Sequence, residues 1–239
     1  MACTNTITNT LQWASAYILN RPSSGVSGFP NEPALTNANL IMSTILAPPF
    51  AWQWNRAVEQ FNTIVGQSDY FISAPFFGWL EKATITNVPN ASPPIIELQI
   101  SPLLAASGKQ NRPFEICPVF DDNDGNLTFR LFPIPDQIYT VTLTYQKAPV
   151  TAIALTNTWA PIPDKYNFLY ERAMLAQLHA MYDAATYAME IQIFFRQLVG
   201  CSEGLSDVAK AIFLEDQLAQ IRTQAAQMAA SSASPKRGQ

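Results

Sequence analysis

The chain has 239 residues, enough to bury a sizeable core in one domain or in two modest ones. Charged residues make up only 13%, about half of the ~25% typical of globular proteins, and the net charge is -4. The acidic balance argues against a protein that grips nucleic acid by neutralising phosphates, and the neutral polar surface favours a chain mostly covered by neighbouring subunits over a free monomer with a charged coat.

The first fifty residues have a helical pattern. Ile7, Leu11, Ala14 and Ile18 recur at the spacing of one helical face, which predicts a helix over residues 4–20. A loop rich in Ser, Gly and Pro follows. A second helical pattern covers residues 37–46. The prolines at 48 and 49 are expected to end this helix.

From about residue 60 to residue 149 the hydrophobic period changes to two. Apolar and polar residues alternate in three runs, at 96–100, 126–132 and 139–146. Proline clusters separate these runs. The pattern predicts an antiparallel β-module, either a small sandwich or a partial barrel.

After Pro163 the helical pattern returns, over residues 164–182, 186–199 and 206–229. Asp164 is expected at the start of the first of these helices, where a carboxylate meets free N–H groups. The predicted fold class is therefore α+β. Residues 1–55 and 160–230 would form a helical bundle, residues 56–159 a β insertion, and residues 231–239 an extended C-terminal tail that a partner holds.

No chemistry-bearing motif stands out. His179 is the single histidine and lies in an apolar helical stretch, where a packing role is favoured over catalysis. Cys3, Cys117 and Cys201 are far apart and form no CxxC pair. The motifs GxGxxG and GxxxxGK[ST] are missing. One GxSxG sequence stands at residues 200–204, but it lies between two predicted helices, whereas the serine of a nucleophile elbow follows a strand. We therefore expect no catalytic residues, no metal and no cofactor. With no signal peptide and no apolar run of ~20 residues, we also expect a cytosolic chain with no membrane association.

Two local features allow alternatives. The run Asp121-Asp122-Asn123-Asp124-Gly125 resembles a calcium loop but lacks the ligands at the first and last positions, so a hairpin turn is favoured. Several aromatic side chains could form a carbohydrate-stacking platform, although core packing is the preferred interpretation: Trp52, Trp54, Phe76, Phe77 and Trp79.

The order of motifs supports a more specific hypothesis. Five segments in order, NLIMSTILAPPFAWQWNRA, GQSDYFIS, FFGWLEKATI, FRLFPIPDQIYTVTLTYQKAP and TWAPIPDKYNFLYERAMLAQ, carry the resemblance. Together they resemble bacteriophage head-to-tail connector proteins, the adaptor or tail tubular protein A-like components of phage necks. The resemblance spans residues 40–214, and its motifs are structural.

This resemblance implies a non-enzymatic virion protein of the neck, assembled in the host cytoplasm as a homo-oligomeric, dodecameric ring. The ring would lie under the portal protein, extend the channel through which DNA passes without specific binding, and dock the tail or nozzle protein. We expect Pro235, Lys236 and Arg237 to dock on acidic portal loops, and the hairpin with Asp121, Asp122 and Asp124 to face the tail. The alternatives are another phage tail protein, such as a tail-completion or tube component, and a carbohydrate-binding module.

Overall fold

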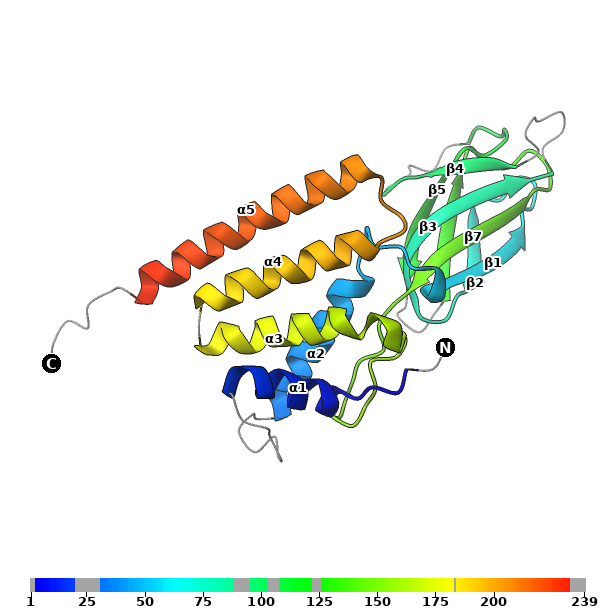
Figure 1. Cartoon of the computed structure of the whole chain (residues 1–239). Helices are drawn as coiled ribbons and strands as arrows, with labels where there is room; N and C mark the ends of the chain where they lie inside the picture. The colour runs from blue at the N-terminus through cyan, green and yellow to red at the C-terminus, as the bar shows by residue number, and fades with distance from the viewer. Residues whose placement is uncertain are drawn as a thin grey trace, which may run out of the picture. The chain divides into compact units, whose positions relative to one another are not determined.

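The computed structural model describes residues 3–19, 31–87, 95–102, 108–121, 126–182 and 184–232. The chain divides into two compact units, one helical and one built from strands. The helical unit comprises Met1–Trp54 with Pro149–Gln239, and the β unit comprises Asn55–Ala148. The α+β class predicted from the sequence is confirmed (Figure 1).

In the described residues the helical unit contains five α-helices, together with the short 3₁₀ helix η2 (Asp164–Tyr166). A second 3₁₀ helix, η1 (Gln53–Asn55), lies at the chain boundary between the two units. The α-helices are α1 (Ile7–Leu19), α2 (Asn31–Leu46), α3 (Asn167–Tyr182), α4 (Ala184–Cys201) and α5 (Asp207–Ser232). Helix α3 contacts α1, α2 and α4, whereas the main helix contact of α5 is with α4. Figure 1 shows α3, α4 and α5 lying side by side in chain order.

The helix starts follow local rules. The Thr6 hydroxyl accepts the N–H of Asn9 (3.2 Å) and caps α1, and the Ser206 hydroxyl accepts the N–H of Ala209 (3.2 Å) and caps α5. Helix α2 begins at Asn31, earlier than the sequence predicts, with Pro33 in its first turn. Proline is tolerated there because the first-turn N–H groups have no partner within the helix.

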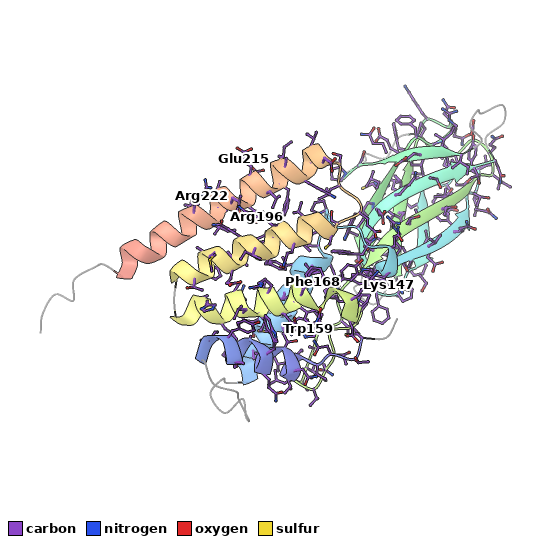
Figure 2. All side chains as sticks on the ribbon, in the orientation of Figure 1. Lys147, Trp159, Phe168, Arg196, Glu215 and Arg222 are labelled. Carbon is purple, nitrogen blue, oxygen red and sulfur yellow. The ribbon has the colours of Figure 1, made fainter. Side chains whose placement is uncertain are left out.

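Residues 149–159, which sequence analysis assigned to the β insertion, lie with the helices. The first free N–H groups of α1, those of Ile7 and Thr8, donate to the carbonyls of Asn157 and Leu155 (both 3.0 Å). Trp159 is fully buried in the helical core, where its ring stacks on that of Tyr170 (centroids 4.5 Å apart), and Figure 2 shows it between α1 and α3. The segment therefore supplies hydrogen-bond acceptors to the N-terminus of α1, and Trp159 adds a large side chain to the core of the helical unit.

Asp164 does not cap its own helix, contrary to the expectation from the sequence. Its carboxylate accepts the Thr4 hydroxyl (2.7 Å) and the backbone N–H groups of Thr4 and Asn5 (3.0 to 3.2 Å). These donors, the Thr4 hydroxyl first, lower the pKa of Asp164 to about 2. The carboxylate therefore fastens the segment that precedes α1.

The β unit contains seven described strands in the order β1-β7-β3-β4-β5-β6-β2, a nearly closed, barrel-like sheet. The strands are β1 (Arg56–Asn62), β2 (Asp69–Ser73), β3 (Phe77–Thr86), β4 (Ile96–Ile100), β5 (Glu115–Asp121), β6 (Asn126–Phe132) and β7 (Thr140–Lys147). Alternate residues of β6 and β7 point into the core, as predicted from their period of two.

The prediction of a wholly antiparallel module is wrong at one place, because β4 and β5 run parallel, with Gln99 opposite Glu115. The connection between them, residues 101–114, is long enough to return the chain to the same end of the sheet, which a parallel pairing requires. At the seam between the two outermost strands, the rings of Phe61 (β1) and Tyr70 (β2) lie 4.9 Å apart. The two outermost strands, β1 and β2, are thus joined by side-chain packing, whereas backbone hydrogen bonds join the other neighbouring strands.

Candidate interaction surfaces

The described part of the chain holds no cluster of three His, Cys, Asp or Glu side chains that could bind a metal ion. His179 is half-buried in α3, and the three cysteines are free thiols. Burial raises the pKa of Cys3 and of Cys201 above the ordinary thiol value. A raised pKa disfavours the thiolate, so neither cysteine has the environment of an activated nucleophile. The exposed surfaces of the chain are the candidate functional features.

The helical unit has an apolar groove of about 180 Å³ between α2, α3, α4 and α5. Ile191 and Phe194 of α4 and Ile221 of α5 form its buried lining, and Leu40 of α2 stands at its edge with 53% of its surface exposed. Amide side chains from Gln177, Gln217 and Gln220 supply neutral polar groups. None of the described lining residues is charged, so the groove suits an apolar or neutral ligand.

The opposite side of α5 is also partly apolar. Val208 is 70% exposed and Ile212 is 57% exposed, one turn apart on the helix. Figure 2 shows Glu215 and Arg222 on the side of α5 away from α4. Helix α5 therefore has apolar residues on two faces, although only one of these faces packs on α4 in this chain.

A second apolar surface lies on the outside of the β unit. The strand register places Phe71 of β2 and Phe120 of β5 on either side of Thr128 of β6. Phe71 is 70% exposed, Phe120 is 59% exposed, and Val119, at a bulge in β5, is 46% exposed. We call these four residues the Phe71–Phe120 patch. Exposed aromatic rings on a rigid sheet are typical of protein contact sites.

An ion pair borders this patch. The guanidinium of Arg130 donates two hydrogen bonds to the Asp69 carboxylate, at 2.7 and 2.8 Å. These hydrogen bonds hold the pKa of Asp69 below its ordinary value. The pair fixes β2 against β6 next to the exposed rings, so the patch is displayed on a firmly held surface.

The end of the β unit carries three further exposed aliphatic side chains, from Ile64, Val65 and Ile138, at 53% to 63% exposure. Two side-chain hydroxyl groups hold the Ile64–Val65 turn. The Thr63 hydroxyl binds the carbonyl of Gln137 and the N–H of Tyr139, and the Tyr70 hydroxyl accepts the N–H of Ile64 at 3.1 Å. This turn is a second rigid apolar projection of the β unit.

Only one of the predicted contact residues falls in the described part of the chain. Asp121 is exposed at the end of β5, opposite Leu127 in the antiparallel register with β6. Asp122 and Asp124 lie outside the described residues, as do Pro235, Lys236 and Arg237. The predicted hairpin therefore has its two strands in place, and its turn lies outside the described ranges.

Of the five aromatic residues considered as an alternative carbohydrate-stacking platform, Trp52 is fully buried and packs in the helical core, whereas Phe76 is 62% exposed. Trp54 packs against the same core, and Phe77 packs against the core of the β unit. Sequence reasoning missed the exposed Val208, Ile212, Phe71 and Phe120. The apolar residues on both faces of α5 were the signal that could have indicated the first two.

A two-unit α+β chain with several exposed apolar surfaces has the character of a protein that assembles with others. A model of the SU10 adaptor protein family matches residues 34–234, and the chain belongs to this family. It is a bacteriophage adaptor, a structural component of the virion that interacts with other phage structural proteins. Structural adaptor families of this kind are typically non-enzymatic.

A comparison with curated proteins gave no match. Among the described residues, none of the helices combines the length and apolar character needed to cross a bilayer.

Proposed function

We propose that this adaptor is the head-to-tail connector of its phage. Copies of the chain form a dodecameric ring under the portal, extend the DNA channel and provide the platform on which the tail assembles. The match to the adaptor family over residues 34–234 carries this proposal. The low charge content and the exposed apolar surfaces support it, because a ring component buries much of its surface against other proteins.

The acidic net charge of -4 fits a channel through which DNA slides. Neutralising phosphates with Lys and Arg would bind the DNA and retard it. An acidic or neutral lining avoids this binding, so DNA would pass without specific contacts.

We assign the portal contact to the C-terminal tail, residues 231–239, with Pro235, Lys236 and Arg237 as anchors; the first two residues of this predicted tail form the end of α5. A basic chain end can pair with acidic loops of a partner. The tail-side contact is assigned to the β unit, where the hairpin with Asp121, Asp122 and Asp124 adjoins the Phe71–Phe120 patch in sequence. An exposed aromatic ring with a carboxylate beside it, as Phe120 has in Asp121, is a composition suited to a specific protein contact.

Deletion of residues 233–239 tests the portal contact, because it leaves α5 intact to its last residue, Ser232. The shortened chain is expected to fold normally and to fail in binding purified portal rings in a pull-down. The substitutions Lys236→Glu and Arg237→Glu form a matched pair that retains the length. Normal portal binding by the shortened chain would remove the assignment.

Immunogold electron microscopy on partly disrupted virions tests the connector role itself. Gold concentrated at the head–tail junction is the expected result. Gold along the tail or at its tip would instead assign the chain to a tube or tail-completion role, and virions without label would refute a virion function at the junction.

A further inference from the structure

Helix α5 has two apolar faces that are separated by half a turn of rotation. Val208 and Gln217 are nine residues apart, as are Ile212 and Ile221, and nine residues make two and a half helical turns. Gln217 and Ile221 line the groove, so Val208 and Ile212 point in the opposite direction, where they are largely exposed. We call the exposed pair, with the exposed Ala211 beside it, the α5 ridge.

An exposed apolar ridge of this kind is expected to be buried against another surface. Helices of soluble proteins normally carry one apolar stripe, which faces their own core, and polar residues on the other side. The inner stripe of α5, with Phe213, Leu214 and Ile221, already packs on the helical core. The ridge is therefore a second apolar surface of α5, and no described residue of the chain buries it.

We propose that the α5 ridge of one copy inserts into the groove between α2, α3, α4 and α5 of the next copy. The proposal rests on the ring of the proposed function and identifies the contact that builds it. The groove presents what the ridge requires: an aliphatic and aromatic lining, an exposed Leu40 at its edge, and no charged residue among the described lining side chains. The groove volume of about 180 Å³ is a size suited to one or two aliphatic side chains.

The position of the two surfaces decides the symmetry of the contact. Ridge and groove use opposite faces of the same helix, so a copy whose groove is filled still presents its ridge. Such a contact is heterologous, and it generates a closed ring when the rotation between successive copies closes. A ridge-to-ridge contact would be isologous and would stop at a dimer.

Cross-linking of engineered cysteines distinguishes these arrangements. The test chain carries Leu40→Cys and Ile212→Cys, with Cys3→Ser and Cys201→Ser to remove the half-buried native thiols. It is supplied as the only adaptor in phage particles, which are treated with a short bis-maleimide. We expect a ladder of covalent multimers on denaturing gels, because every ridge would lie in a neighbour's groove.

The controls are matched to each surface. A chain with either engineered cysteine alone should remain monomeric on the gel, because the remaining native thiol, Cys117, is buried. A chain that carries Ile212→Cys with Ile153→Cys should also remain monomeric, since Ile153 is 84% exposed but lies outside the groove. Val208→Cys with Leu40→Cys is a second test pair if Ile212→Cys disturbs folding, as judged by circular dichroism.

Three results would overturn the inference. Dimers from Ile212→Cys alone would show a ridge-to-ridge contact. The absence of a ladder from both test pairs, in particles whose head–tail junction is labelled by immunogold, would show that another surface joins the copies while the connector role stands. Particles without label at the junction would refute the proposed function, and this inference with it.

Discussion

The hydrogen bond between Trp159 and Thr10 allows a quantitative test of the helical core. The indole N–H of Trp159 donates to the Thr10 hydroxyl at 2.8 Å, and both side chains are fully buried. Thr10→Val keeps a similar shape but removes the acceptor. A buried N–H group left without a partner costs about 1–3 kcal/mol, so the free energy of unfolding of the helical unit should fall by this amount.

A double-mutant cycle isolates the hydrogen bond from the packing. Trp159→Phe removes the donor and also reduces the stack on Tyr170, so it should cost about 2 kcal/mol or more. When both partners are apolar, no donor is left unsatisfied. The double variant should therefore be more stable than the sum of the single changes predicts, by about 1 kcal/mol.

Urea unfolding followed by circular dichroism at 222 nm is the appropriate assay, because this signal reports on the helices and not on the replaced tryptophan. Thr223→Val is the matched control, since the Thr223 hydroxyl is exposed and bonds only to Ala219 of its own helix. It should change stability by less than about 0.5 kcal/mol. Equal stability of Thr10→Val and the wild type, or strict additivity in the cycle, would refute the reasoning.

Three further perturbations test other parts of the fold. The pKa of Asp164 is lowered to about 2, so its hold on Thr4 and Asn5 should persist above pH ~4 and be lost as the pH falls toward 2, measured by amide hydrogen exchange at these two residues. Gly78→Ala should destabilise the β unit by about 1–3 kcal/mol in thermal unfolding, because a Cβ there would lie 2.8 Å from the Gln146 carbonyl oxygen and the Ala148 nitrogen. Glu190→Gln should cost about 1–2 kcal/mol, because it leaves Arg172 without its 2.8 Å carboxylate partner at a site where the Glu190 side chain is only 9% exposed.

Each of these has a control within the chain. Asp164→Asn should speed exchange at Thr4 and Asn5 at neutral pH, and unchanged exchange would contradict the role of the carboxylate. Gly108→Ala should be silent, because a Cβ there meets nothing within 4 Å; an equal loss in both glycine variants would argue against the close contact. A chain with both Arg172→Met and Glu190→Met should recover stability relative to Glu190→Gln, since an apolar pair leaves no buried charge.

The sequence by itself determined the local structure and the order of elements. The runs 96–100 and 126–132 alternate polar and apolar residues, and they are β4 and β6 to the residue. Ser206 was predicted near a helix start and caps α5. These features depend on neighbours along the chain, so a local pattern is sufficient to predict them. The resemblance to phage connectors likewise agrees with the adaptor family that the chain matches.

Only the tertiary structure decided features that depend on distant residues. Asp164 is followed by a helix, yet its carboxylate binds Thr4 and Asn5 across most of the sequence. Residues 149–159 follow the β-module in the chain, yet carbonyls of this segment accept hydrogen bonds from the N-terminus of α1. The parallel pairing of β4 with β5 also depends on a long connection, whose path no periodicity encodes.

The candidate surfaces show the same division. Val208, Ile212, Phe213 and Ile221 are all apolar residues of one helix, and the sequence predicts that helix without indicating which of its faces is buried. Packing on α4 buries Ile221 and leaves Ile212 more than half exposed. Hydrophobicity is a property of each residue, whereas burial depends on which element lies opposite, so the exposed ridge became visible only when the neighbours of α5 were known.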